Sequence, residues 1–285
     1  MFKKLLAVAG LLLPLAAAHP ALAESQAGHH AEARVNLAAV PIGRMSLPWW
    51  RERFERSLAR VRQGHVHLIW LGDSITENWE RAGPQPWADY RPAWNRFYGD
   101  RAAVNMGFMG DTTASVIWRL DHGEVAGLHP KALILLIVAN NVGLTHRHAE
   151  KTLDGIEAII RILRHKLPET KILLLGVLPS ARSPWITENT QILNAMLQRE
   201  FDHAPGVTFL NVGYLFYRNG HLNRSLYLDP HEALAASRKP GLTVWTVPSV
   251  CLHPDAQGMA LIAQAIEPTL HRLMGDQDHR RQPAG

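Results

Sequence analysis

Short runs of apolar residues recur along the chain and alternate with segments whose apolar residues are spaced by three or four. Five of the runs are short enough for strands, at residues 66–71, 102–105, 132–139, 171–177 and 207–212. Helical spacing marks residues 49–61, 148–166, 185–203 and a last segment that begins near Pro254. Strands that alternate with amphipathic helices predict a parallel sheet that is covered by helices on both faces.

Small and polar residues follow the first three predicted strands. The first strand runs into the sequence GDS, which contains Ser74, and the second runs into the loop NMGFMGDTT at residues 105–113. The third is followed by Asn140, and His253 directly precedes the last predicted helix. Reactive groups of parallel sheets gather at the carboxyl ends of the strands. We therefore expect a serine, a glycine loop, an asparagine and a histidine to meet at this edge.

This combination of groups is suited to acyl transfer. Ser74 needs a base to accept its proton, and a neutral histidine such as His253 fulfils that role near pH 7. The backbone N–H groups of Ser74 and Gly110 and the side-chain amide of Asn140 are candidate donors to an oxyanion. Taken alone, GDS is more typical of a helix start than of a nucleophile, because Asp and Ser are favoured N-cap residues.

The four segments GDSIT, NMGFMGDTT, the Asn140 turn and LHPDAQG resemble, in order, the four blocks of the SGNH/GDSL hydrolases. The sequence is most similar to the platelet-activating-factor acetylhydrolase alpha-subunit type, in which the glycine loop is followed by WRL and GE, found here at residues 118–120 and 123–124. The resemblance covers about residues 66–270. It implies a flavodoxin-like three-layer α/β/α sandwich with a five-stranded parallel sheet and no cofactor. It also implies that Ser74 is the nucleophile, Gly110 and Asn140 are oxyanion donors, and His253 is the base.

Two positions depart from the pattern of that family. Val138 and Ala139 stand where the family usually has Gly-Thr, although the asparagine that follows is kept as Asn140. Val250 stands three residues before His253, where the family places its catalytic aspartate. The second departure raises the question of which residue orients the histidine.

Asp229 is the candidate for the missing acid. In the acetylhydrolase pattern a glycine precedes the acid by nine residues, and the count from Gly220 leads to Asp229. His253 follows 24 residues later, which predicts an insertion of about 21 residues between acid and base. Two alternatives are that Asp229 only opens a turn, or that a backbone carbonyl orients His253. A third group that orients the base is a general requirement of such triads.

The N-terminal residues have the order of a secretory signal peptide, with two lysines, an apolar segment and Ala21-Leu22-Ala23 before Glu24. We expect a signal peptide at 1–23, a flexible arm at 24–45, a hydrolase domain at 46–275 and a disordered tail at 276–285. The protein should then be periplasmic or secreted, without a stable membrane anchor. Cys251 is the only cysteine, which excludes an intrachain disulfide.

Charge and histidine content exclude other classes of function. The net charge of +5 is dispersed and forms no basic stripe with aromatic residues, so we expect no nucleic-acid partner. None of the 16 histidines belongs to a zinc-binding motif, so we expect no metal.

The sequence therefore predicts a serine esterase that hydrolyses short-chain, acetyl-type esters through an acyl-serine intermediate. Its substrate would be a small-molecule or carbohydrate ester. The alternatives are a polysaccharide O-acetyltransferase that uses the same serine, and a non-catalytic carbohydrate-binding protein if the acid–base pair is lost. The oligomeric state is left open.

Overall fold

A computed structural model of the chain describes residues 35–237 and 250–281. The predicted signal peptide, most of the predicted arm and most of the insertion between Asp229 and His253 lie outside the described residues. The described part includes all five residues predicted for the catalytic machinery.

Five parallel strands form the central sheet, in the order β2–β1–β3–β4–β5. The strands are β1 (Leu68–Gly72), β2 (Ala103–Gly107), β3 (Ala132–Leu136), β4 (Lys171–Leu175) and β5 (Val207–Leu210). This order is that of the flavodoxin-like fold, in which the direction of strand addition reverses after β2, so that the switch point lies between β1 and β3. The predicted fold class is thereby confirmed.

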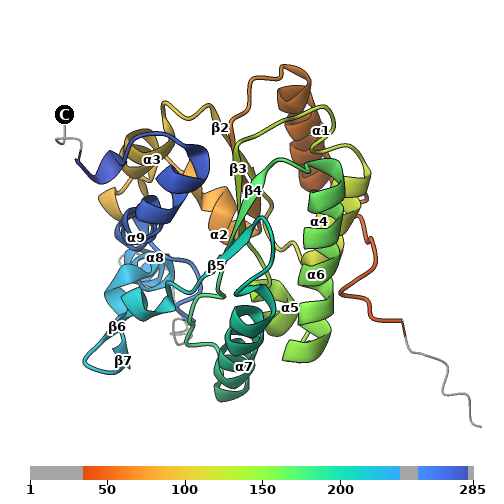
Figure 1. The fold of residues 1–285 in the computed structure, drawn as a ribbon. Helices are drawn as coiled ribbons and strands as arrows, with labels where there is room; N and C mark the ends of the chain where they lie inside the picture. Colours follow the sequence, from red (N-terminus) through yellow and green to blue (C-terminus); the bar gives the residue numbers. More distant parts are fainter. Residues whose placement is uncertain (1–34, 238–249, 282–285) are drawn as a thin grey trace, which may run out of the picture. The chain divides into compact units, whose positions relative to one another are not determined.

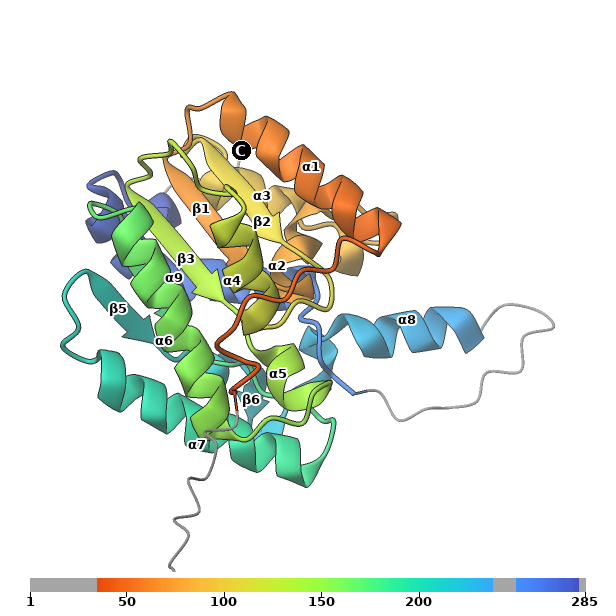
Figure 2. The same cartoon turned by 90° about the vertical axis from the view of Figure 1, so that its right-hand side faces the viewer.

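Helices cover both faces of the sheet, because successive strand residues point to opposite sides. Ile69 and Leu71 of β1 belong to one core, and Leu68 and Trp70 belong to the other. The first core is covered by α1 (Pro48–Arg62), α4 (Thr113–Asp121), α6 (Ala149–Lys166) and α7 (Pro184–Phe201). The second is covered by α3 (Arg91–Tyr98) and α9 (Ala256–Met274). Figures 1 and 2 show these two helical layers with the sheet between them.

Two of these helices were not predicted. α3 and α4 are only eight and nine residues long, so neither shows the several repeats of helical spacing by which the longer helices are predicted. Shorter elements surround the carboxyl edge of the sheet. They are α2 (Ser74–Glu77), α5 (Ala139–Gly143), α8 (Leu228–Ser237) and the hairpin of β6 (Tyr217–Arg218) and β7 (His221–Leu222).

Segments on both sides of the predicted domain 46–275 pack against it. Before it, the side-chain amide of Asn36 donates to Asp154, and the backbone of Ile42 donates to the carbonyl of Ala114. After it, Asp276 pairs with Arg101, and the side chain of His279 is buried and bonded to Glu267. The packed unit therefore includes residues 36–45 and 276–281 as well.

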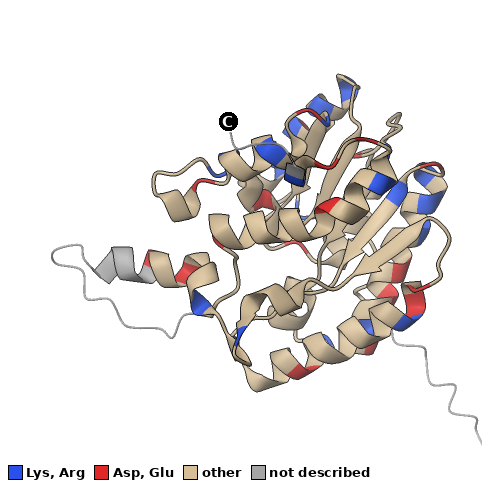
Figure 3. Cartoon of the chain, turned by 60° about the vertical axis from the view of Figure 1, so that its left-hand side comes forward, with Lys and Arg blue, Asp and Glu red and all other residues tan. Residues whose placement is uncertain are grey.

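Basic and acidic residues are interspersed along the helices (Figure 3). Within residues 35–237 and 250–281, no helix combines the length and the apolar character needed to cross a membrane.

Candidate active site

Ser74 begins helix α2 directly after strand β1. The position before Asp73 leaves no room for a side chain, since a Cβ atom at Gly72 would lie 2.2 Å from the carbonyl oxygen of Leu136 on the neighbouring strand. Asp73 caps the helix, because its carboxylate accepts a hydrogen bond from the backbone N–H of Ile75. GDS therefore is a helix start as well as the position of the predicted nucleophile. The two interpretations of this motif are compatible.

A continuous chain of hydrogen bonds joins the three residues predicted as the triad. Ser74 Oγ lies 3.0 Å from His253 Nε2. His253 Nδ1 lies 3.2 Å from Asp229 Oδ1. Both ring nitrogens of the histidine are thus engaged, one with the hydroxyl and one with the carboxylate, which is the geometry that an activated serine requires.

A short antiparallel contact of the backbone brings Asp229 to His253. Tyr227 pairs with Pro254 in an isolated β-bridge, and the backbone N–H of Leu228 donates to the carbonyl of His253 at 2.7 Å. The next bond of the same ladder runs from the N–H of Asp255 to the carbonyl of Leu226 at 2.9 Å. The backbone before Asp229 thus lies beside the backbone at His253 and Asp255. This contact holds the acid next to the base although the insertion separates them in the chain.

The carboxylate of Asp229 is also fixed by the backbone. Its second oxygen accepts from the N–H groups of Leu252 at 2.7 Å and of His253 at 3.1 Å. Burial by itself would raise the pKa of Asp229, but the hydrogen bonds from His253 and Leu252 outweigh burial and lower this pKa below its ordinary value. Asp229 is therefore ionised at neutral pH and suited to stabilise a protonated His253.

The predicted oxyanion donors lie in the loops that follow β2 and β3. Gly110 has a φ of +73°, in the left-handed region that favours glycine. The side-chain amide of Asn140 donates one hydrogen to the carbonyl of Asp111 at 2.9 Å, which holds it against the glycine loop. Its second amide hydrogen has no hydrogen-bond partner among the described residues. Ser74, Gly110 and Asn140 thus follow three neighbouring strands at the carboxyl edge of the sheet.

Val138 occupies an unusual conformation just before Asn140. It caps α5 with φ 90° and ψ −6°, a left-handed conformation that a β-branched residue rarely adopts. Its side chain is buried. The left-handed conformation thus gives a physical reason for the glycine that related hydrolases usually carry here.

Arg119 connects the loops of the site, and its role was not predicted. Its guanidinium donates to the carbonyl of Gly72, before the nucleophile, and to the carboxylate of Asp111 in the glycine loop. A second carboxylate, Glu124, is bonded to the same group, and all three side chains are fully buried. Arg119 and Glu124 lie in the segments at 118–120 and 123–124 that match the acetylhydrolase pattern. The sequence therefore marks these two residues but does not indicate that they form a buried ion pair.

Arg182 is a second residue that sequence reasoning missed. Its Nη1 donates to the carbonyl of Ala139 at 2.8 Å, and its Nε donates to the hydroxyl of Ser180 at 3.0 Å. Burial lowers its pKa, while the charges of Asp73 and Asp229 favour the protonated form. Arg182 therefore lies beside the site and links α5 to the segment that follows β4.

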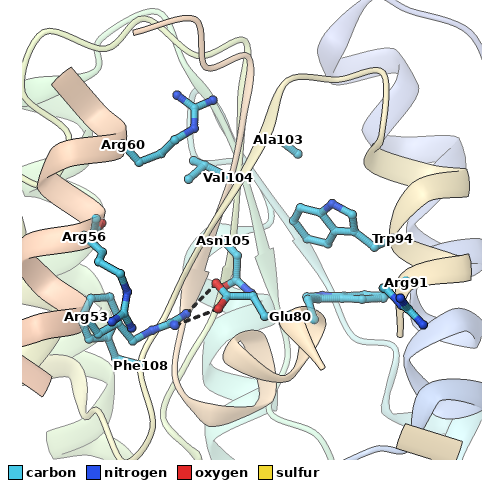
Figure 4. Close-up of a pocket in the computed structure, with 12 residues that line it drawn as sticks. Arg53, Arg56, Arg60, Glu80, Arg91, Trp94, Ala103, Val104, Asn105 and Phe108 are labelled. Carbon is cyan, nitrogen blue, oxygen red and sulfur yellow. Dashed lines mark hydrogen bonds and ion pairs between the residues drawn. The ribbon is translucent and has the colours of Figure 1, made fainter. Parts of the chain in front are cut away.

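A cavity of about 460 Å³ at the β2 edge of the sheet is separate from this site (Figure 4). Its lining includes Arg53, Arg56 and Arg60 of α1 and Arg91 and Trp94 of α3, but none of the predicted site residues. Both terminal nitrogens of Arg53 bind Glu80, and its Nε donates to the carbonyl of Gly107. Arg56 and Arg91 have carboxylate partners as well. The charges of this cavity are largely paired, and we assign it no ligand.

No group of three or more His, Cys, Asp or Glu side chains suited to a metal ion occurs among the described residues. Cys251 is buried beside the site.

The fold and the four blocks define a hydrolase of the SGNH type. The model of the GDSL-like Lipase/Acylhydrolase family matches residues 70–261, and the chain belongs to this family.

Similar proteins agree with this assignment. The subunit alpha2 of platelet-activating factor acetylhydrolase IB from Gallus gallus is 27% identical over 164 residues, which are 57% of this chain and 66% of that protein. The human alpha1 subunit is 26% identical over 163 residues, covering 57% of this chain and 65% of that subunit. The match thus spans slightly less than two thirds of these curated relatives.

A solved structure of a GDSL-like lipase from Bacteroides thetaiotaomicron has the same fold. It superposes with a TM-score of 0.54 at 18% identity, covering 77% of this chain and 97% of that chain. At this identity the similarity shows the fold alone.

Proposed function

We propose that the protein is a serine esterase that hydrolyses short-chain, acetyl-type esters through an acyl-Ser74 intermediate. The observation that supports this most directly is the hydrogen-bonded chain from Ser74 Oγ through His253 to Asp229. The names of the relatives, which are acetylhydrolases, support acetyl as the acyl group.

In the proposed acylation step, Ser74 Oγ attacks the ester carbonyl carbon and His253 Nε2 accepts the hydroxyl proton. The oxyanion that forms accepts hydrogen bonds from the N–H groups of Ser74 and Gly110 and from the Asn140 amide. Asp229 stabilises the imidazolium. When the intermediate collapses, His253 returns the proton to the leaving alcohol and the acyl group stays on Ser74.

In the proposed deacylation step, a water molecule attacks the acyl-serine while His253 accepts one of its protons. Collapse of the second tetrahedral intermediate transfers that proton to Ser74 Oγ and releases the carboxylic acid. The enzyme returns to its initial state without a cofactor.

Labelling with a fluorophosphonate, followed by peptide mapping, tests this function. An active esterase carries the label on Ser74, and the variants Ser74→Ala and His253→Ala lose it. Ser46→Ala, at an exposed serine before α1, serves as the matched control and keeps full labelling. The proposal fails if the folded protein stays unlabelled under conditions that label a control serine hydrolase, or if the label maps to another residue.

We also propose that the protein is exported, on the basis of its N-terminal residues. N-terminal sequencing of the protein purified from separated cell fractions should find Glu24 as the first residue in the periplasm or medium. A cytoplasmic protein that still begins at Met1 would contradict this.

A further inference from the structure

A second cavity of about 460 Å³ lies between α7 and the end of β5, and we call it the α7–β5 cavity. It is lined by Val177, Pro179, Ser180, Thr187, Thr190, Gln191, Asn194, Ala195, Gln198, Phe209, Asn211, Gly213, Tyr214 and Tyr217. This lining contains hydroxyls, amides and aromatic rings but no carboxylate, ammonium, guanidinium or imidazole. It thus differs from the β2-edge cavity with its arginines (Figure 4).

Several polar groups of this lining are free to bind a ligand. Within the described structure, the amide of Gln191 and the hydroxyls of Tyr214 and Tyr217 have no hydrogen-bond partner. Asn211 uses its side-chain oxygen to accept from Gly213, which leaves its amide hydrogens free. Amides and hydroxyls both donate and accept, so together they suit a ligand rich in hydroxyl groups.

Two exposed tyrosines stand at the same cavity. The exposed fraction is 67% for Tyr214 and 43% for Tyr217, which is high for large aromatic side chains. An aromatic ring combines an apolar face with a polar edge, and it loses little conformational entropy when it binds. The apolar face of a sugar ring can pack against such a surface, while its hydroxyls reach the amides.

The α7–β5 cavity adjoins the active site through the segment that follows β4. Ser180 belongs to the cavity lining and accepts a hydrogen bond from Arg182, which also donates to the carbonyl of Ala139, next to Asn140. Three inter-strand spacings separate β1, which carries Ser74, from β5. A ligand that occupies both places must therefore span roughly 14 Å. This length exceeds a monosaccharide.

We propose that the α7–β5 cavity binds the sugar chain of the substrate, so that the ester cleaved at Ser74 is carried by a neutral oligosaccharide. The cleavage of the ester at Ser74 rests on the proposed esterase function. The binding of a sugar chain in the α7–β5 cavity does not depend on that function. A long acyl chain is a poorer occupant, because it would leave the amides and hydroxyls without partners. An anionic ligand would find no cation in the lining.

Binding is measured first, with the inactive variant Ser74→Ala and unsubstituted oligosaccharides. Titration of cellohexaose, xylohexaose and chitohexaose, followed by calorimetry and NMR, should show millimolar or tighter binding of at least one. Tyr214→Ala and Gln191→Ala should each weaken that binding about tenfold, since they remove a stacking surface and a polar anchor. Gln264→Ala, at an exposed glutamine of α9, is the matched control and should leave it unchanged.

Catalysis is measured second, on acetylated xylohexaose and on p-nitrophenyl acetate. In Tyr214→Ala and Gln191→Ala the ratio of kcat/KM for the oligosaccharide to that for p-nitrophenyl acetate should fall about tenfold, while Gln264→Ala keeps the original ratio. The proposal is overturned if none of the three oligosaccharides binds, or if both cavity variants bind them as tightly as the protein without the cavity substitution. Fluorophosphonate labelling of Ser74 reports on the esterase function separately, so the two failures are distinguishable.

Discussion

The carboxylate of Asp229 lies 3.2 Å from Nδ1 of His253, although 24 residues separate them in the chain. In related hydrolases only three residues separate the acid from the base, and Val250 occupies that position here. The antiparallel contact between Tyr227 and Pro254 explains how an insertion is accommodated, because it fixes the two ends of the inserted segment side by side. The bridge thus keeps the acid and the base in contact across the insertion.

Asp229→Asn should lower kcat by up to about 10⁴-fold with a small effect on folding. The asparagine oxygen would still accept from the N–H groups of Leu252 and His253, so its NH₂ group would face Nδ1. Nδ1 would then have to accept a hydrogen bond, which places the proton on Nε2 and prevents that atom from accepting the proton of Ser74. Initial rates on p-nitrophenyl acetate measure the change.

The matched control for this variant is Asp202→Asn, at an exposed aspartate that follows α7. It should keep the wild-type rate. If Asp229→Asn also stays within threefold of the wild type, the enzyme works with a Ser–His dyad, and Asp229 has a structural role only.

Asn140→Ala should lower kcat by roughly 10²–10³-fold with a much smaller change in KM, because the bond to the oxyanion forms mainly in the transition state. Asn140→Asp has nearly the same shape but no amide hydrogen, and it should lose a similar amount. Steady-state kinetics separate the two parameters. A higher KM at unchanged kcat would instead make Asn140 a contact to the bound substrate.

Much of this site could be predicted from sequence because the carboxyl ends of parallel strands meet at one edge. Ser74, Gly110 and Asn140 each follow a strand of this sheet, so the strand order alone brings them together. Asp229 was found only by its spacing from a glycine. The β-bridge that positions it joins two short segments far apart in the chain, and neither has the length or periodicity that identifies a strand.

Arg119 and Arg182 could not be predicted for a different reason. A charged residue in a sequence is expected at the surface, and only the tertiary neighbours show that Arg119 is buried between Asp111 and Glu124. The α7–β5 cavity likewise depends on side chains of α7, β5 and the β4 loop that share no motif.

The buried carboxyl of Asp73 should make stability fall as the pH rises. Burial raises its pKa to about 7, from an ordinary value of 3.8. Between these values the folded protein holds the proton more tightly than the unfolded chain, so the stabilisation is complete below pH 3.8 and is lost as the pH approaches 7. Asp73→Asn keeps the cap on Ile75 but does not ionise. Relative to the wild type, it should therefore gain stability between pH 4.5 and 8.

Urea unfolding of the wild type and of Asp73→Asn at pH 4.5 and at pH 8 measures this difference in stability. Asp202→Asn is again the control, and its difference from the wild type should be the same at both. If Asp73→Asn shows a constant difference as well, the Asp73 carboxyl does not titrate in this window.

Arg119→Met should destabilise the protein by about 3–5 kcal/mol, because it leaves Asp111 and Glu124 buried without their common cation. Adding Glu124→Gln to this variant should restore part of the loss. Arg56→Met removes an exposed pair with Glu52 and should change stability by less than about 1 kcal/mol. Denaturant unfolding compares the three variants. A loss below about 1 kcal/mol for Arg119→Met would mean that the buried network is not needed to hold the two loops.

Val138→Gly tests the strained turn that precedes Asn140. Two effects oppose each other in this variant. The buried isopropyl group is lost, which destabilises the fold, but glycine adopts the left-handed conformation without the penalty of about 1–2 kcal/mol that a residue with a Cβ atom incurs. Val177→Gly is the matched control, since Val177 is similarly buried and is not among the residues with positive φ.

Val138→Gly should therefore cost about 1–2 kcal/mol less than Val177→Gly in denaturant unfolding. Its kcat should stay close to that of the wild type, because the turn keeps its shape and Asn140 remains bonded to the carbonyl of Asp111. Equal losses of stability would show that the valine is not strained. If the stability difference between the two variants is as expected but the kcat of Val138→Gly falls strongly, the side chain of Val138, rather than the backbone turn, holds Asn140 toward the oxyanion.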